Sequence, residues 1–168
     1  MTKIDAHGLG YRELNEELRR AEGEIEIDGC MGQRFIASGM SGKKIKINGI
    51  PGNALGAYLD GSEIEVMGNV QDAVGDTMNF GTIAIHGSAG DAVGYAMRGG
   101  EIYVRDNAGY RAGIHMKAYA DRFPVDSSTY YCPYFFRFKI LIIVIDLDVD
   151  IEVKTDVRFC IVGYHVMA

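Results

Sequence analysis

The chain has 168 residues, a net charge of −6 and an apolar content of 48%, which indicates one folded domain, with or without an appendage. It has no basic run or stripe, so nucleic acid and an anionic membrane are not expected partners. The N-terminal stretch lacks the apolar segment of a signal peptide, and no stretch is long enough to span a membrane. We therefore expect a cytoplasmic protein in which Cys30, Cys132 and Cys160 are reduced thiols.

The first predicted element is an amphipathic helix over residues 11–22. Its apolar face repeats at helical spacing, and Gly23 follows as a helix stop. The apolar face consists of Tyr11, Leu14, Leu18 and Ala21. We expect the helix to cover the open strand edge of the segment that follows, because an unpaired edge invites association with other chains. The alternative is that the helix docks on a partner subunit. Residues 1–23 thus form an N-terminal arm and a capping helix.

Five consecutive segments within residues 24–124 repeat one pattern of about 19 residues. Each segment opens with two apolar residues two positions apart, which is the alternation of a strand with one buried face. The pairs are Ile25/Ile27, Ile45/Ile47, Ile64/Val66, Ile83/Ile85 and Ile102/Val104. The first repeat has one extra residue, which we place near residues 37–39. A fixed period of this size is typical of stacked repeats, in which each unit buries its apolar face on its neighbours.

Glycines recur in register within the repeats, where we expect them to turn the chain at corners. These structural turn glycines are Gly29, Gly32, Gly49, Gly52, Gly56, Gly68, Gly75, Gly87, Gly90, Gly94, Gly109 and Gly113. A phosphate-binding glycine loop would occur once and lead into a helix, and neither condition is met here. The pattern predicts an all-β fold, a right-handed parallel β-helix of about five coils, with one repeat per coil. A second interior ladder would contain Leu59, Met78, Met97 and Met116.

The repeats carry no pattern typical of a catalytic or metal site. His7, His86 and His115 lack the spacing of paired metal ligands, so we interpret them as surface or turn residues. Asp72 and Asp91 are one period apart and would stack. We expect these carboxylates to support turns by bonding their own backbone, because an oxygen-ligand cation site needs more carboxylates. We therefore predict no catalytic, cofactor-binding or metal-binding residue in this chain.

Residues 125–168 no longer follow the repeat. A dense apolar run at 135–145 passes into strict alternation at 145–153, which predicts one or two strands that could pair over the last coil. Two hypotheses account for the change. Either the tail has been replaced, or the reading frame has shifted near Val125. Glycine coils in another reading frame of the gene would support the shift, and their absence from both other frames would refute it.

The repeats resemble the C-terminal GXGXG domain of the glutamate synthase large subunit. The segment GCMGQRF carries that family's first-coil pattern, with matching residues at Gly29, Gly32, Gln33 and Phe35. Residues 68–75 resemble a later coil, and the Leu-Arg-Arg-Ala ending of the predicted helix is also similar. The small subunit of formylmethanofuran dehydrogenase has a related coil pattern. The resemblance covers about residues 11–124.

The resemblance implies a right-handed β-helix with a structural role. In the family, this domain packs between an amidotransferase domain that releases ammonia from glutamine and an FMN domain that makes glutamate from 2-oxoglutarate. We therefore expect a stand-alone, non-catalytic subunit whose partners are glutamine amidotransferase and FMN-binding synthase subunits. FMN and iron–sulfur clusters are expected on those partners and not on this chain. The alternative is a scaffold like the small subunit of formylmethanofuran dehydrogenase, and a homo-oligomer is compatible with either.

Overall fold

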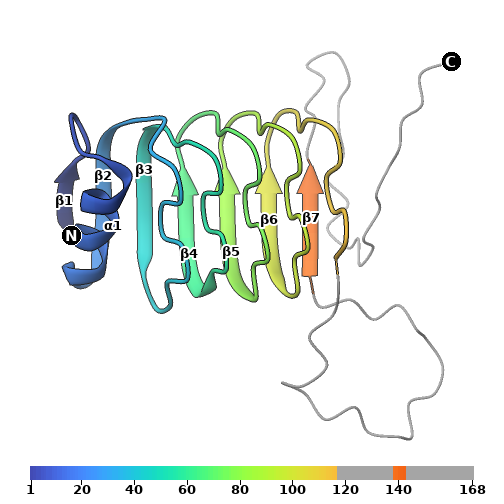
Figure 1. Cartoon of the computed structure of the whole chain (residues 1–168), viewed down its shortest axis with the longest axis horizontal. Helices are drawn as coiled ribbons and strands as arrows, with labels where there is room; N and C mark the ends of the chain where they lie inside the picture. The colour runs from blue at the N-terminus through green and yellow to red at the C-terminus, as the bar shows by residue number, and fades with distance from the viewer. Residues whose placement is uncertain (117–137, 143–168) are drawn as a thin grey trace, which may run out of the picture.

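The computed structural model describes residues 1–116 and the backbone of residues 138–142. This part of the chain contains one helix and a seven-stranded sheet whose strands follow one another in sequence order, each parallel to the next (Figure 1). The elements are β1 Thr2–Asp5, α1 Tyr11–Arg20, β2 Glu24–Met31, β3 Lys44–Ile50, β4 Asp60–Val66, β5 Phe80–Ile85, β6 Gly100–Val104 and β7 Phe138–Ile142. The first coil begins with β2, and each of the next four begins with the following strand.

Consecutive strands bring the same repeat position side by side. Ile25, Ile45, Ile64, Ile83 and Ile102 are register partners from β2 to β6, and none is more than 2% exposed. These residues form an isoleucine ladder, which confirms the predicted stacking of the apolar pairs from one repeat to the next. Full burial of one such side chain contributes about 1.5–3 kcal/mol, so the ladder is a main source of stability.

A second ladder lies in the same interior. Leu59, Met78 and Met97 are fully buried and Met116 is partly buried, as predicted, and Met40 adds a member from the first coil. The two ladders confirm a parallel β-solenoid of about five coils with one short helix. The handedness of the solenoid stays a prediction.

The extra residue of the first coil lies in β2. Ile27 pairs with Ile47, twenty positions later, whereas Cys30 pairs with Gly49, nineteen positions later. The added residue is therefore a bulge between Ile27 and Cys30, and its predicted place near residues 37–39 is wrong. The apolar pattern of this coil tolerates a one-residue gap at several positions, and only the pairing with β3 decides between them.

After each strand, the chain bonds alternately to the coil behind it and the coil ahead. The Gly56 N–H donates to Ile36 O at 2.9 Å, and the Tyr58 N–H donates to Asp76 O at 2.8 Å. The same bonds recur one repeat later. The equivalent Gly75 has a φ of +66°, and a Cβ there would lie 2.5 Å from Ile102 Cδ1. Glycine at this position therefore permits the backbone conformation and leaves room for the isoleucine ladder.

The predicted turn glycines form two groups. Those with positive φ are Gly29, Gly32, Gly49, Gly56, Gly75, Gly94 and Gly113. In the second group, a Cβ would come within 3.2 Å of an atom of the preceding coil, and this group contains Gly52, Gly68, Gly87, Gly90 and Gly109. Close stacking of coils, and not a turn through positive φ, is therefore the physical reason for glycine in this second group.

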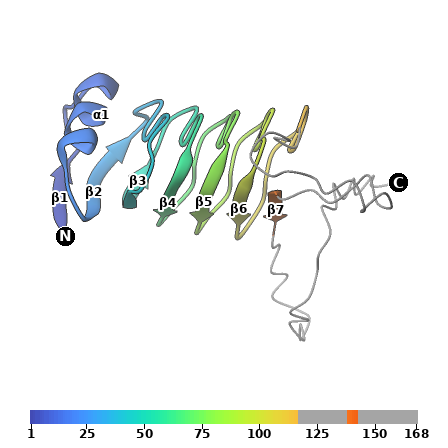
Figure 2. The same ribbon diagram turned by 90° about the horizontal axis from the view of Figure 1, so that it is seen from below.

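The open edge of β2 is covered by a strand and not by the helix. β1 pairs with β2 in parallel, with Ile4 opposite Ile27. α1 instead lies across the start of the solenoid, where Leu14 and Leu18 are fully buried in the common core (Figure 2). The prediction that the helix covers the strand edge is therefore wrong. Backbone groups of an edge strand need hydrogen-bond partners, which a strand supplies and a packed helix face does not.

The helix also ends earlier than predicted. Arg20 is its last residue, and the Ala21 N–H donates to Glu17 O at 2.9 Å. Gly23 has a φ of +73° and lies beyond the cap, where it directs the chain into β2. At the other end, the Glu13 carboxylate accepts the Gly10 N–H at 2.7 Å, which satisfies one free donor at the helix start.

At the far end of the sheet, β7 pairs with β6 in parallel, with Ile102 opposite Ile140. This confirms a tail strand beside the last coil. The alternating segment, the reading-frame hypothesis, Cys132 and Cys160 lie outside the described residues. Within the residues that are described, no helix is long and apolar enough to cross a membrane.

Candidate functional site

The outward face of the sheet carries charged residues that pair between neighbouring strands. Lys3 Nζ lies 2.9 Å from Glu26 Oε2, and Lys44 Nζ lies 3.4 Å from Glu63 Oε2. The hydrogen bond from Lys3 lowers the pKa of the Glu26 carboxyl, and that carboxyl raises the pKa of Lys3. The Lys3, Lys44 and Glu63 side chains are exposed, whereas Glu26 is largely covered and also accepts a hydrogen bond from Asn48 at 3.1 Å. These contacts pair charges between strands, so this face is a charge-paired surface without catalytic geometry.

The stacked aspartates bond the backbone of the next coil. Asp72 Oδ1 accepts the Asp91 N–H at 2.9 Å, and Asp91 Oδ1 accepts the Tyr110 N–H at 2.8 Å. Asn53 Oδ1 begins this ladder by accepting the Asp72 N–H at 3.3 Å. The expectation that each carboxylate bonds its own backbone is therefore wrong, because the equivalent N–H of the neighbouring coil lies within reach. In residues 1–116, no cluster of three or more His, Cys, Asp or Glu side chains could hold a metal.

The three histidines of the described chain lie far apart and each has a local partner. His86 Nε2 is 2.9 Å from Glu65 Oε1, and the His115 ring meets Tyr95 edge-on at 5.6 Å between centroids. His7 Nδ1 is 2.6 Å from Asp5 Oδ1. The backbone N–H of His7 also donates to that oxygen and is the largest cause of the lowered pKa of Asp5.

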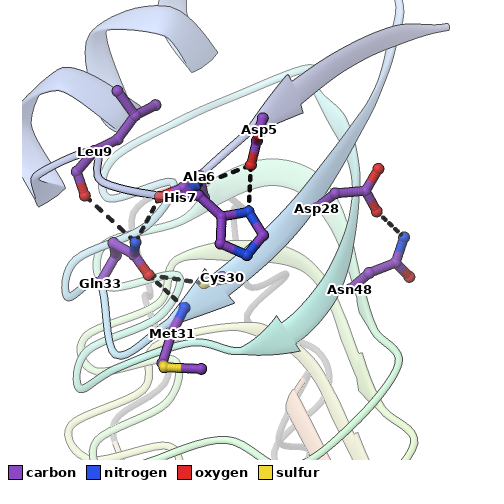
Figure 3. A network of polar contacts seen from close by, with 9 residues as sticks. All are labelled: Asp5, Ala6, His7, Leu9, Asp28, Cys30, Met31, Gln33 and Asn48. Atoms are coloured by element: carbon purple, nitrogen blue, oxygen red, sulfur yellow. Dashed lines mark hydrogen bonds and ion pairs between the residues drawn. The ribbon is translucent and has the colours of Figure 1, made fainter.

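The Gly-x-x-Gly-Gln-x-Phe segment holds the N-terminal arm against the first coil (Figure 3). Gln33 Nε2 donates to Ala6 O at 2.9 Å and to Leu9 O at 3.3 Å, while its Oε1 accepts the Met31 N–H at 2.6 Å. Gly29 leaves space for the His7 ring, since a Cβ there would lie 2.1 Å from the imidazole.

Phe35, the last residue of this segment, contacts the helix that follows the arm. The Phe35 ring packs against Tyr11 of α1 with centroids 6.0 Å apart. Together with Gly29 and Gln33, it makes the motif a docking element for the arm and the helix. The sequence motif marks these residues but gives no indication of this docking role.

Asn15 of α1 supplies a hydrogen-bond acceptor to the first coil, where no preceding coil can provide one. In later coils, the N–H at this turn position donates to a carbonyl of the coil behind, as Gly56 donates to Ile36. In the first coil, the equivalent Ala37 N–H donates to Asn15 Oδ1 at 2.9 Å, and the Asn15 side chain is buried. Lys43 similarly donates to the Ala21 carbonyl at the helix end. The role of Asn15 was not predicted from the sequence. Its place next to Leu14 on the apolar face of the helix was the feature that could have indicated it.

Cys30 is the one cysteine within the described residues. It is buried and free, and burial raises the pKa of its thiol to about 11. The thiol donates to Gln33 Oε1 at 3.4 Å. At neutral pH it is therefore protonated and unsuited to act as a nucleophile.

The described chain is a capped parallel β-solenoid whose polar side chains bond one coil to the next. The GXGXG motif family matches residues 15–135, and the chain belongs to this family, which is that of the C-terminal domain of the glutamate synthase large subunit. The predicted relation to the small subunit of formylmethanofuran dehydrogenase is not shown by this match.

One curated relative is similar to the chain, and its name adds no function. An uncharacterized protein of Methanocaldococcus jannaschii is 49% identical over 130 residues, which is 73% of this chain and 50% of that protein. The chain thus spans about half the length of this relative. No solved structure matches the chain.

Proposed function

We propose that this chain is a non-catalytic structural and assembly subunit of a glutamate synthase-type complex. It would pack between a glutamine amidotransferase subunit and an FMN-binding synthase subunit, which together convert glutamine and 2-oxoglutarate to glutamate. FMN and iron–sulfur clusters would be bound by those partners. The observation that carries the proposal is family membership across residues 15–135, the greater part of the chain.

The use of polar groups in residues 1–116 supports a scaffold. Gln33, Asn15 and Asp72 each bond backbone groups of a neighbouring segment, so their role is in packing. The Cys30 thiol is held in its neutral form. Catalysis needs groups that converge on one reacting atom, and these groups are instead distributed along the length of the solenoid.

Purification of the tagged full-length chain from its native host tests the proposal. We expect an amidotransferase and an FMN-containing subunit to be recovered with it, together with glutamate synthase activity. Recovery of neither subunit would refute the proposal. Glutamine hydrolysis or 2-oxoglutarate amination by the purified chain alone would contradict the non-catalytic role. Neighbouring genes for molybdenum or tungsten enzymes would instead favour the formylmethanofuran dehydrogenase alternative.

A further inference from the structure

Four exposed apolar side chains lie on α1, at the ends of β2 and β3, and in the turn after β2, which is the first corner of the solenoid. The exposed fractions are 43% for Tyr11, 82% for Met31, 45% for Phe35 and 46% for Ile50. Met31 and Ile50 are register partners on β2 and β3, and the Tyr11 and Phe35 rings are in contact. Met31 and Phe35 are four residues apart on the same corner. We call these four residues the first-corner patch.

The coil itself does not require apolar residues at these positions. The repeat places polar residues one, two and three coils after Ile50, namely Asn69, Ser88 and Asn107. The position of Phe35 is likewise taken by small or charged residues, namely Ala54, Ala73, Ala92 and Arg111. The corner forms the same coil-to-coil bonds with either kind of residue. The patch is therefore an addition to the fold, and grouped exposed apolar side chains mark interaction sites.

Two arginines lie beside the patch. Arg12 Cζ is 5.6 Å from the centroid of the Tyr11 ring, and the exposed Arg34 precedes Phe35. Neither guanidinium belongs to a carboxylate ion pair in the described part of the chain. In a chain of net charge −6, these arginines form a local positive rim. Aromatic residues, methionine and arginine are the types enriched at protein interfaces.

We propose that the first-corner patch binds a partner subunit whose contact surface has an apolar centre and carboxylates at its rim. This inference rests on the proposed function and adds the place of contact. A second copy of the chain fits less well. A twofold contact would bring two pairs of Arg12 and Arg34 together, with no carboxylate in the patch to neutralise them.

The repeat supplies the variants for the test. Met31→Asn combined with Ile50→Asn introduces the residue that the next coil has at the same position, Asn69, so the coil should still form. Phe80 is 60% exposed on β5, and Phe80→Asn is the matched control away from the patch. Each full-length variant is titrated against the purified amidotransferase and FMN-binding subunits of the host by calorimetry. Urea unfolding of each variant checks that the coil is intact.

We expect wild type to bind both subunits and the double variant to bind one of them at least about tenfold more weakly. Phe80→Asn should bind that subunit within about twofold of wild type. Arg34→Glu should weaken binding as well, more at low salt than at high salt. Equal binding by the wild type and the double variant would overturn this inference alone. Binding of wild type to neither subunit would overturn the proposed function, and this inference with it. A wild-type dimer that the double variant converts to a monomer would assign the patch to a second copy and refute the proposal.

Discussion

The strongest test of the cap is the substitution Asn15→Ala. It removes Oδ1, the acceptor of the buried Ala37 N–H, and leaves that donor without a partner. An unsatisfied buried donor costs about 1–3 kcal/mol. Alanine has the higher helix propensity and recovers at most about 0.7 kcal/mol. We therefore expect the free energy of unfolding to fall by about 1–2 kcal/mol.

Urea unfolding followed by circular dichroism measures the effect on stability. With a slope of about 2 kcal/mol per molar urea, the midpoint should fall by roughly 0.5–1 M. Glu17→Ala is the matched control, because its side chain is exposed on the same helix, and its midpoint should change little. Hydrogen exchange at the Ala37 amide adds a local measurement and should become about tenfold faster for each 1.4 kcal/mol lost. If Asn15→Ala and Glu17→Ala unfolded at the same urea concentration, the hydrogen bond from Ala37 to Asn15 would not contribute to the stability of the first coil.

Three further predictions follow from the packing and charges. Gly81→Ala should be far more destabilising than Gly23→Ala in urea unfolding. A Cβ at Gly81 would lie 2.3 Å from a backbone oxygen of the preceding coil, whereas a Cβ at Gly23 would have no atom within 4 Å. Equal unfolding midpoints for the two variants would contradict this prediction. Cys30 should react with a thiol reagent at pH 8 only as the protein unfolds, since burial raises the pKa of its thiol to about 11, and rapid labelling of the folded chain would exclude that burial. Glu26 has a lowered pKa in the folded state, so its contribution to stability is present near neutral pH and is lost as the pH falls through that lowered value. The small stability difference between wild type and Glu26→Gln should therefore disappear in acid, and one that persists there would show that the pairing with Lys3 is not its cause.

The repeated strands could be predicted because their signal is local and occurs five times. Ile25 and Ile45 each show the alternation of a half-buried strand, and the constant step between repeats fixes which strands are neighbours. The position of the bulge between Ile27 and Cys30 could not be predicted in the same way. It depends on hydrogen bonds between two coils, and the first coil tolerates the extra residue at several places in its sequence.

The cap was predictable only in outline. Leu14 and Leu18 indicated a helix with one buried face, and both are buried. The pairing of β1 was not expected, since Thr2–Asp5 is a four-residue segment with a single buried position at Ile4. The roles of Asn15 and Gln33 depend on backbone groups 22 to 27 residues away in the sequence. Long-range side-chain bonds of this kind leave no periodic signal.

The sequence by itself determined the stacked architecture and the absence of a phosphate-loop arrangement, because periodic burial and recurrent glycine are properties of each repeat. Only the tertiary structure decided how the first coil is completed and which surface remains apolar. Those features arise where the repetition begins, and there each backbone group must find a partner outside the pattern. The arm, the helix and the first-corner patch all lie at that beginning, which is where the 19-residue period contains the least information about contacts.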